Sequence, residues 1–188
     1  FLFFRNFGLN ISIGRFIPQF KVKKKYSEIK TSIISVLLFQ LIISSLFVIL
    51  FWISADFLAL HYFKDPRASF LLRVLSFYFI TSIFFKNLAS FFKGFQKNRL
   101  QSLIEPVKNI SMLTMIVLFL YLGYGILAPI LAYVFAGLVL LLLFIYPVLK
   151  TFNFSKYSFK NLSVFKRMFL FGLPVMMTGV GTKFVSYF

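Results

Sequence analysis

The sequence predicts an all-α integral membrane protein. Hydrophobic residues make up 60% of the 188 residues, and the mean hydropathy of +0.91 is too high for a soluble domain. Residues 31–53 are 23 residues without a charge, enough for a helix to cross the roughly 30 Å hydrocarbon core of a bilayer. The basic residues lie between such apolar runs, so a net charge of +17 does not indicate a nucleic-acid-binding surface.

Six apolar segments are long enough to be transmembrane helices, and we expect the first and the last to be incomplete. These spans are 1–20, 31–53, 68–92, 106–122, 126–149 and 169–188. Because both ends look like helices cut through, we expect the chain to be an internal piece of a longer protein.

The first span, 1–20, carries positive charge on one face. Five of its residues share an arc of about 80° when successive residues are placed 100° apart: Arg5, Gly8, Ser12, Arg15 and Gln19. A charge at bilayer depth costs about 2.5–3.5 kcal/mol. Either this face lines a water-filled cavity, or each arginine extends to its own interface. Pro18 is expected to bend or end the helix.

The second span, 31–53, follows five lysines, and short loops rich in Lys and Arg stay on the cytoplasmic side. A polar loop with an Asp-Pro turn connects it to the third span, 68–92. Arg73 and Lys86 lie near opposite ends of that span. We therefore expect each of these side chains to reach water along the helix.

The fourth and fifth spans, 106–122 and 126–149, are predicted to be joined by a tight Gly-Tyr-Gly turn. Pro106 fits the first turn of a helix, where the missing N–H of proline costs nothing. Glu105 stands three residues before Lys108, a spacing that allows an ion pair at the helix mouth.

A basic connection, 150–167, interleaves aromatic residues with lysines. We expect it to lie on anionic lipid headgroups rather than to stack on nucleic-acid bases. The last span, 169–188, holds Pro174 and three glycines, which predicts a kinked or discontinuous helix of the kind found at transporter binding sites. Lys183 lies deep in this span.

The distribution of positive charge predicts the orientation of the chain. When the spans alternate in direction, 16 of the 21 cations fall on one side, in or near the loops 21–30, 93–105 and 150–167. That side is cytoplasmic by the positive-inside rule. We therefore expect a multi-pass protein of the inner, cytoplasmic cell membrane.

The chain lacks the residues from which enzyme sites are usually built. It has no cysteine, one histidine and four acidic residues, and no phosphate-binding loop with Gly-Lys-Ser/Thr. We therefore expect no catalytic residue, no metal ligand and no cofactor. His61 and Asp65 have a spacing used by some acyltransferases, but an ordinary polar loop is the favoured interpretation.

Four short motifs occur in order along the chain. They are Gly8-Leu9 with Arg15-Phe16-Ile17, Tyr62-Phe63-Lys64-Asp65-Pro66, Lys93-Gly94-Phe95-Gln96-Lys97, and Phe171-Gly172-Leu173-Pro174. Together they resemble the polysaccharide biosynthesis proteins, the Wzx-type flippases of the multidrug/oligosaccharidyl-lipid/polysaccharide exporter superfamily. The resemblance covers essentially the whole chain. It implies a part of a two-lobed transporter with twelve to fourteen helices, from the second helix to the start of the seventh.

The resemblance implies a transporter, not an enzyme, that moves undecaprenyl-pyrophosphate-linked sugar repeat units to the outer leaflet for polysaccharide or O-antigen biosynthesis. Its partners would be the lipid-linked oligosaccharide, membrane lipids and other polysaccharide assembly proteins. Arg15 matches the family's arginine after Gly-Leu and is the first candidate for binding the substrate, with Lys183 and Arg5 as further candidates. A multidrug or cation exporter of the same superfamily, a membrane-embedded glycan-modifying enzyme and a structural scaffold are the alternatives.

Overall fold

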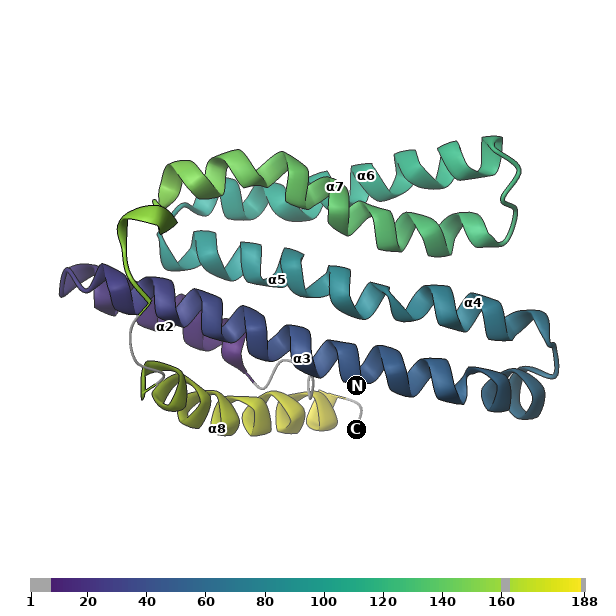
Figure 1. Ribbon diagram of the computed structural model, residues 1–188, viewed down its shortest axis with the longest axis horizontal. Coiled ribbons are helices and arrows are strands. Elements are labelled where there is room, and N and C mark those ends of the chain that lie inside the picture. Colours follow the sequence, from purple (N-terminus) through teal and green to yellow (C-terminus); the bar gives the residue numbers. More distant parts are fainter. Residues whose placement is uncertain (1–7, 160–162, 187–188) are drawn as a thin grey trace. The chain divides into compact units, whose positions relative to one another are not determined.

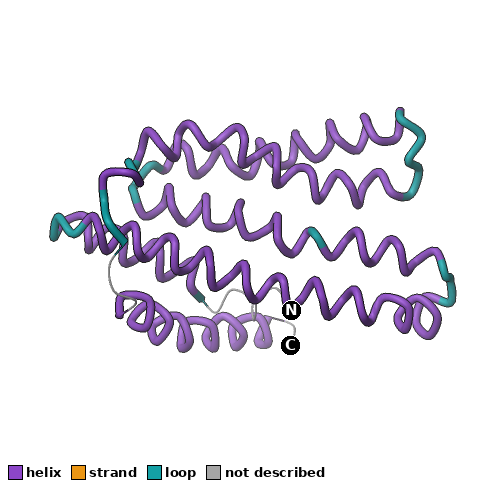
Figure 2. Tube along the Cα trace, viewed as in Figure 1, coloured by secondary structure: helices purple, strands orange, loops and turns teal. Residues whose placement is uncertain are grey.

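The computed structural model describes residues 8–159 and 163–186, with side chains as far as residue 178. Every regular element in this part of the chain is a helix, which confirms the all-α prediction (Figure 2). The helices form two compact units. The first comprises the described parts of Phe1–Gln40, Lys86–Gln101 and Pro147–Phe188, and the second comprises Leu41–Phe85 and Ser102–Tyr146.

Helix α2, Leu9–Val22, begins directly after Gly8, whose φ of +65° places it in the left-handed region that favours glycine. Leu9, Ile13 and Ile17 repeat every four residues and are at most 1% exposed, so one stripe of the helix is buried. Pro18 lies inside α2 and does not end it.

Helix α3, Tyr26–Leu58, continues into a π-helical turn, Ala59–Phe63. The preceding lysines form a short turn in which Lys24 has a φ of +55°. The α3 helix therefore starts at Tyr26 rather than at residue 31. The predicted basic loop 21–30 is correspondingly shorter, because only residues 23–25 lie between α2 and α3.

The third predicted span consists of two helices, α4 (Arg67–Ser76) and α5 (Tyr78–Gly94). Arg73 is 40% exposed and forms an ion pair that its position in the sequence did not indicate. Its Nη2 atom lies 2.7 Å from Oδ2 of Asp56, so the charge of the arginine is paired within the second unit.

Helix α6, Asn98–Tyr121, starts earlier than expected, so Pro106 lies within the helix and not in its first turn. Helix α7, Leu127–Thr151, follows after the predicted tight turn, where Gly123 and Gly125 have φ values of +83° and +51° (Figure 1). These two left-handed conformations explain why glycine stands at both positions of the turn.

Helix α8, Ser163–Ser186, is continuous through Pro174 (Figure 1). Of the two predicted alternatives, a discontinuous helix is therefore wrong for this part of the chain, and a kinked helix stays a prediction. The continuous helix leaves no unwound stretch whose freed backbone groups would need a cavity.

The connection between α7 and α8 contains one short 3-10 helix, Phe154–Lys156. Several aromatic side chains of this connection pack on the protein, whereas Phe159 is exposed, and contact of the segment with lipid headgroups stays a prediction. Phe152 is only 4% exposed, and its ring contacts those of Phe95, Phe154 and Tyr157. Burial of these rings stabilises the first unit, because each aromatic residue removes a large apolar area from water.

Four described segments are long and apolar enough to cross a membrane. They are Tyr26–Phe63, Arg67–Gly94, Asn98–Tyr121 and Leu127–Thr151. They correspond to the second through fifth predicted spans. Large apolar side chains on these helices are exposed, among them Ile53, Val117 and Leu142, as expected for surfaces that contact lipid. The first and last spans are not among the four and remain predictions.

Candidate functional site

Helices α2 and α8 pack against each other along a seam in the first unit, and small residues lie at their closest backbone approach. A Cβ atom on Gly8 would collide with the carbonyl oxygen of Gly172, so the backbones approach closely there. One turn further along α2, Ser12 Oγ donates a hydrogen bond of 3.1 Å to the carbonyl oxygen of Met168. The pairs 8/172 and 12/168 show that the two helices run antiparallel. Close backbone approach through small residues is a common way for helices to associate in membranes.

Arg15 lies on this seam. Its guanidinium carbon is 4.3 Å from the centre of the Phe171 ring, a cation–π contact. Phe16 packs edge-on against the same ring, with centroids 5.8 Å apart and an interplanar angle of 82°. The arginine side chain itself is exposed. The motif around Gly8 and Arg15 therefore meets the Phe-Gly motif of α8, far away in the sequence.

The contact with Phe171 shows which way the arginine points. By the antiparallel register, the level of Arg15 on α2 corresponds to about residue 165 on α8. Phe171 lies six residues beyond that level, about 9 Å along the axis. The guanidinium therefore reaches back along α2, away from the basic turn at 23–25, as side chains in helices do. To reach lipid headgroups on the side of the basic turn at 23–25, the Arg15 side chain would have to point toward the C-terminal end of α2.

Two further cations lie near Arg15 in the first unit, Lys93 on α5 and Lys21 in the last turn of α2. The Lys93 side chain passes Gly14, where an added Cβ would be 3.7 Å from Lys93 Cδ. Lys21 Nζ is 6.0 Å from the centre of the Phe95 ring. Among the described residues, no ion pair involves Arg15, Lys21 or Lys93. The positive charge on this side of the first unit is therefore not neutralised by a neighbouring carboxylate.

A chain of three amides, two of them buried, links α2 to α3 and α5. Gln40, fully buried on α3, donates a hydrogen bond of 2.9 Å to Oδ1 of Asn10 on α2. Its own Oε1 atom accepts a bond of 2.6 Å from Nδ2 of Asn87 on α5. Sequence reasoning missed this chain, although amides inside otherwise apolar helices are the signal that could have found it.

Of the three predicted site residues, the structure describes the side chain of Arg15 alone. The structure brings Arg15 next to Phe171, a residue that the sequence reasoning quoted only as part of a motif. Arg5 lies outside the described residues. Lys183 belongs to α8, but its side chain also lies outside the description. A joint role of the three cations therefore stays a prediction.

The fold and this seam define a multi-helix membrane protein with positive charge on an exposed helix face. The chain matches the model of the family described as polysaccharide biosynthesis protein over residues 1–188, and it belongs to that family. An uncharacterized membrane protein of Methanocaldococcus jannaschii is 27% identical over 203 residues, covering 98% of this chain and 39% of that protein. The chain thus spans about two fifths of the length of this relative. No solved structure matches the chain.

Proposed function

We propose that the protein carrying this chain is a flippase for lipid-linked oligosaccharides. It moves undecaprenyl-pyrophosphate-linked repeat units across the cytoplasmic membrane for polysaccharide or O-antigen biosynthesis. Membership of the polysaccharide biosynthesis family supports the glycan context, and the four candidate membrane spans support the membrane setting. The observation on which the proposal depends is the position of Arg15 against Phe171.

An anionic pyrophosphate needs fixed positive charge to leave water for the interior of a membrane protein. Arginine suits this task because its planar guanidinium donates up to five hydrogen bonds and can grip phosphate oxygens with two at once. Phe171 holds one face of the Arg15 guanidinium and occupies none of the N–H donors at its edge. Those donors remain available to a substrate.

A multidrug or cation exporter of the same superfamily is the main alternative. Such a protein should present carboxylates to its cargo. Glu28, Asp56 and Glu105 each form an ion pair with a cation of the chain, at 2.7–3.3 Å. Three of the four acidic residues are thus paired with cations of the chain, and the fourth, Asp65, is exposed in the turn before α4, which favours an anionic substrate. A membrane-embedded glycan-modifying enzyme would need a free acidic group or a histidine in a site that holds the sugar. His61 and Asp65 are the candidates in this chain, and both are exposed around the turn between α3 and α4.

The proposal is tested in the complete protein with Arg15→Ala, in cells that depend on it for surface polysaccharide. We expect export to be abolished while the amount of protein in the membrane fraction stays normal. Lys97→Ala is the matched control, because it removes an exposed cation in the turn before α6 and should leave export unchanged. Normal export by Arg15→Ala would remove the proposed role of this arginine.

A further inference from the structure

One side of α6 in the second unit is polar and uncovered. The side chain of Glu105 is 69% exposed, and Ser102 and Asn109, on the same side of the helix, are also exposed. Lys108 stands at the edge of this side and is 22% exposed. Its Nζ lies 3.3 Å from Oε1 of Glu105, which confirms the ion pair expected from their spacing. With successive residues 100° apart, the four residues share an arc of about 120°, and we call them the polar stripe.

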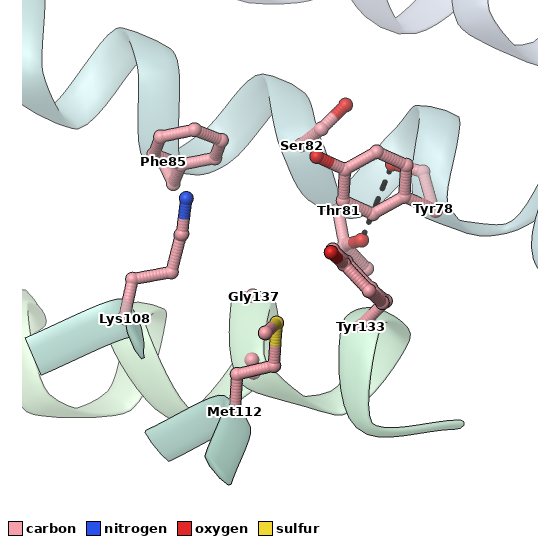
Figure 3. A pocket seen from close by; sticks show the side chains of 9 residues that line it. Tyr78, Thr81, Ser82, Phe85, Lys108, Met112, Tyr133 and Gly137 are labelled. Carbon is pink, nitrogen blue, oxygen red and sulfur yellow. Dashed lines mark hydrogen bonds between the residues drawn. The ribbon is translucent and has the colours of Figure 1, made fainter. Parts of the chain in front are cut away.

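The polar stripe lies at the depth of the membrane-spanning part of the unit. Lys108 lines a small cavity among α5, α6 and α7 together with Thr81 and Gly137, so these three residues lie at about the same depth (Figure 3). Each of them is near the middle of its candidate membrane span. The ion pair between Lys108 and Glu105 is therefore far from the ends of the neighbouring helices.

The outer surface of α7 shows that the apolar layer continues past this depth. Leu142, Leu143 and Ile145 follow Gly137 toward the end of α7, and all three are exposed. Ile145 lies eight residues beyond Gly137, which is about 12 Å along a helix. Exposed apolar side chains in such a row are typical of contact with lipid tails. In the antiparallel helix α6, Glu105 lies about one turn from the cavity in the same direction, inside this apolar layer (Figure 1).

Charged groups at this depth are costly where they face lipid tails, and pairing with Lys108 leaves most of the Glu105 carboxylate uncovered. Helix α6 has a separate side for lipid. Ile110, Leu113 and Val117 are exposed there and point about 80–140° away from Glu105. The polar stripe therefore faces something other than lipid in the complete protein.

Water fits this side of α6 better than a second helix does. A helix packed over the stripe would remove the pair of Lys108 and Glu105 from water, and desolvation of an ion pair can cost more than its attraction returns. The stripe also continues the polar start of α6 at Asn98, so that solvent can follow it from that end. Beyond Asn109 the same arc holds only apolar residues, which are Met112, Ile116, Phe119 and Leu120.

We propose that the polar stripe lines a water-filled vestibule in the complete protein. The vestibule opens on the side where α6 begins, which is the cytoplasmic side in the predicted orientation, and it ends at Asn109 near the middle of the membrane. It gives water and small hydrophilic solutes access to the pair of Lys108 and Glu105. This vestibule requires neither Arg15 nor the proposed transport activity.

The experiment places single cysteines in the complete protein, after replacement of any cysteine outside this chain. Inside-out and right-side-out membrane vesicles are treated with sulfonatoethyl methanethiosulfonate, a charged reagent that does not cross the membrane. Asn109→Cys and Ile110→Cys are the matched pair, because they are neighbours at the same depth on different sides of α6. We expect Asn109→Cys to react roughly tenfold faster or more in inside-out vesicles, since the reagent needs a hydrated thiolate.

Glu105→Cys and Leu103→Cys form a second pair nearer the opening, so that the outcome does not depend on the folding of one variant. Pairs are compared when both members reach normal amounts in the membrane. Equal rates within a pair would show that lipid or another helix covers the stripe and would overturn the proposal. Lys97→Cys, in the turn before α6, marks the side on which α6 begins. Reaction of Asn109→Cys from the opposite side would overturn the direction of the opening.

Discussion

The guanidinium carbon of Arg15 lies 4.3 Å from the centre of the Phe171 ring, so the first and last described helices meet at a charged residue. The glycines of the same two motifs, Gly8 and Gly172, meet one step further along the seam. The motifs that suggested a family therefore have a shared physical purpose. Gly8 and Gly172 let the two helices approach closely, and Phe171 orients the guanidinium of Arg15.

This orientation predicts that the ring matters for transport and not only for packing. Phe171→Leu keeps most of the side-chain volume but removes the π-face, which contributes about 0.5–1 kcal/mol at exposed sites. We expect the initial rate of lipid-linked oligosaccharide transport in proteoliposomes to fall several-fold. Phe171→Tyr keeps the ring and should stay near the wild-type rate. Equal rates for wild type and Phe171→Leu would contradict a positioning role for Phe171.

Gly8 should tolerate substitution less well than Gly123, although both have positive φ angles. In Gly8→Ala the new methyl group meets the carbonyl oxygen of Gly172, whereas nothing lies within 4 Å of the corresponding position in Gly123→Ala. Both variants carry a left-handed strain of about 1–2 kcal/mol. Only Gly8→Ala must also push α8 away. We expect a clearly larger loss of thermal stability in detergent for Gly8→Ala, and equal melting temperatures would refute the close seam.

The amide chain through Gln40 predicts energetic coupling between α3 and α5. A double-mutant cycle of Gln40→Ala and Asn87→Ala, measured by unfolding in detergent micelles, should give a coupling energy of about 0.6–1.7 kcal/mol. The control cycle pairs Gln40→Ala with Asn153→Ala, a surface cap of the short 3-10 helix, and should be additive. Additivity in both cycles would show that the amides do not act as a unit.

The orientation inferred from charge can be measured by single-cysteine labelling of the complete protein, in which any cysteine outside this chain is first replaced; the chain itself contains none. Lys97→Cys and Lys156→Cys should resist a membrane-impermeant maleimide added outside intact cells, since both positions are expected to face the cytoplasm. Lys64→Cys and Tyr124→Cys, which are exposed on the opposite turns, should be labelled. The reverse labelling pattern would show that the chain has the opposite orientation in the membrane.

Local composition was enough to find the central spans. The segments now seen as α3, α4 with α5, α6 and α7 were predictable because length and apolarity are properties of a continuous stretch. The Gly-Tyr-Gly turn and the pairing of Glu105 with Lys108 were predictable for the same reason. The residues at which the helices begin were not predictable in this way. Pro106 suggested a first turn, yet α6 begins at Asn98, since polar residues at a membrane interface continue a helix as readily as apolar ones.

The sequence by itself thus determined a membrane protein of this family, its four central spans and a cation on the first helix. Only the tertiary structure decided that Arg15 turns toward Phe171, that Asp56 neutralises Arg73, and that the rings after α7 pack inward. Each of these depends on residues that are distant in the sequence. Hydropathy and helical spacing describe single helices, whereas the direction and the partner of a side chain depend on which second helix packs beside it.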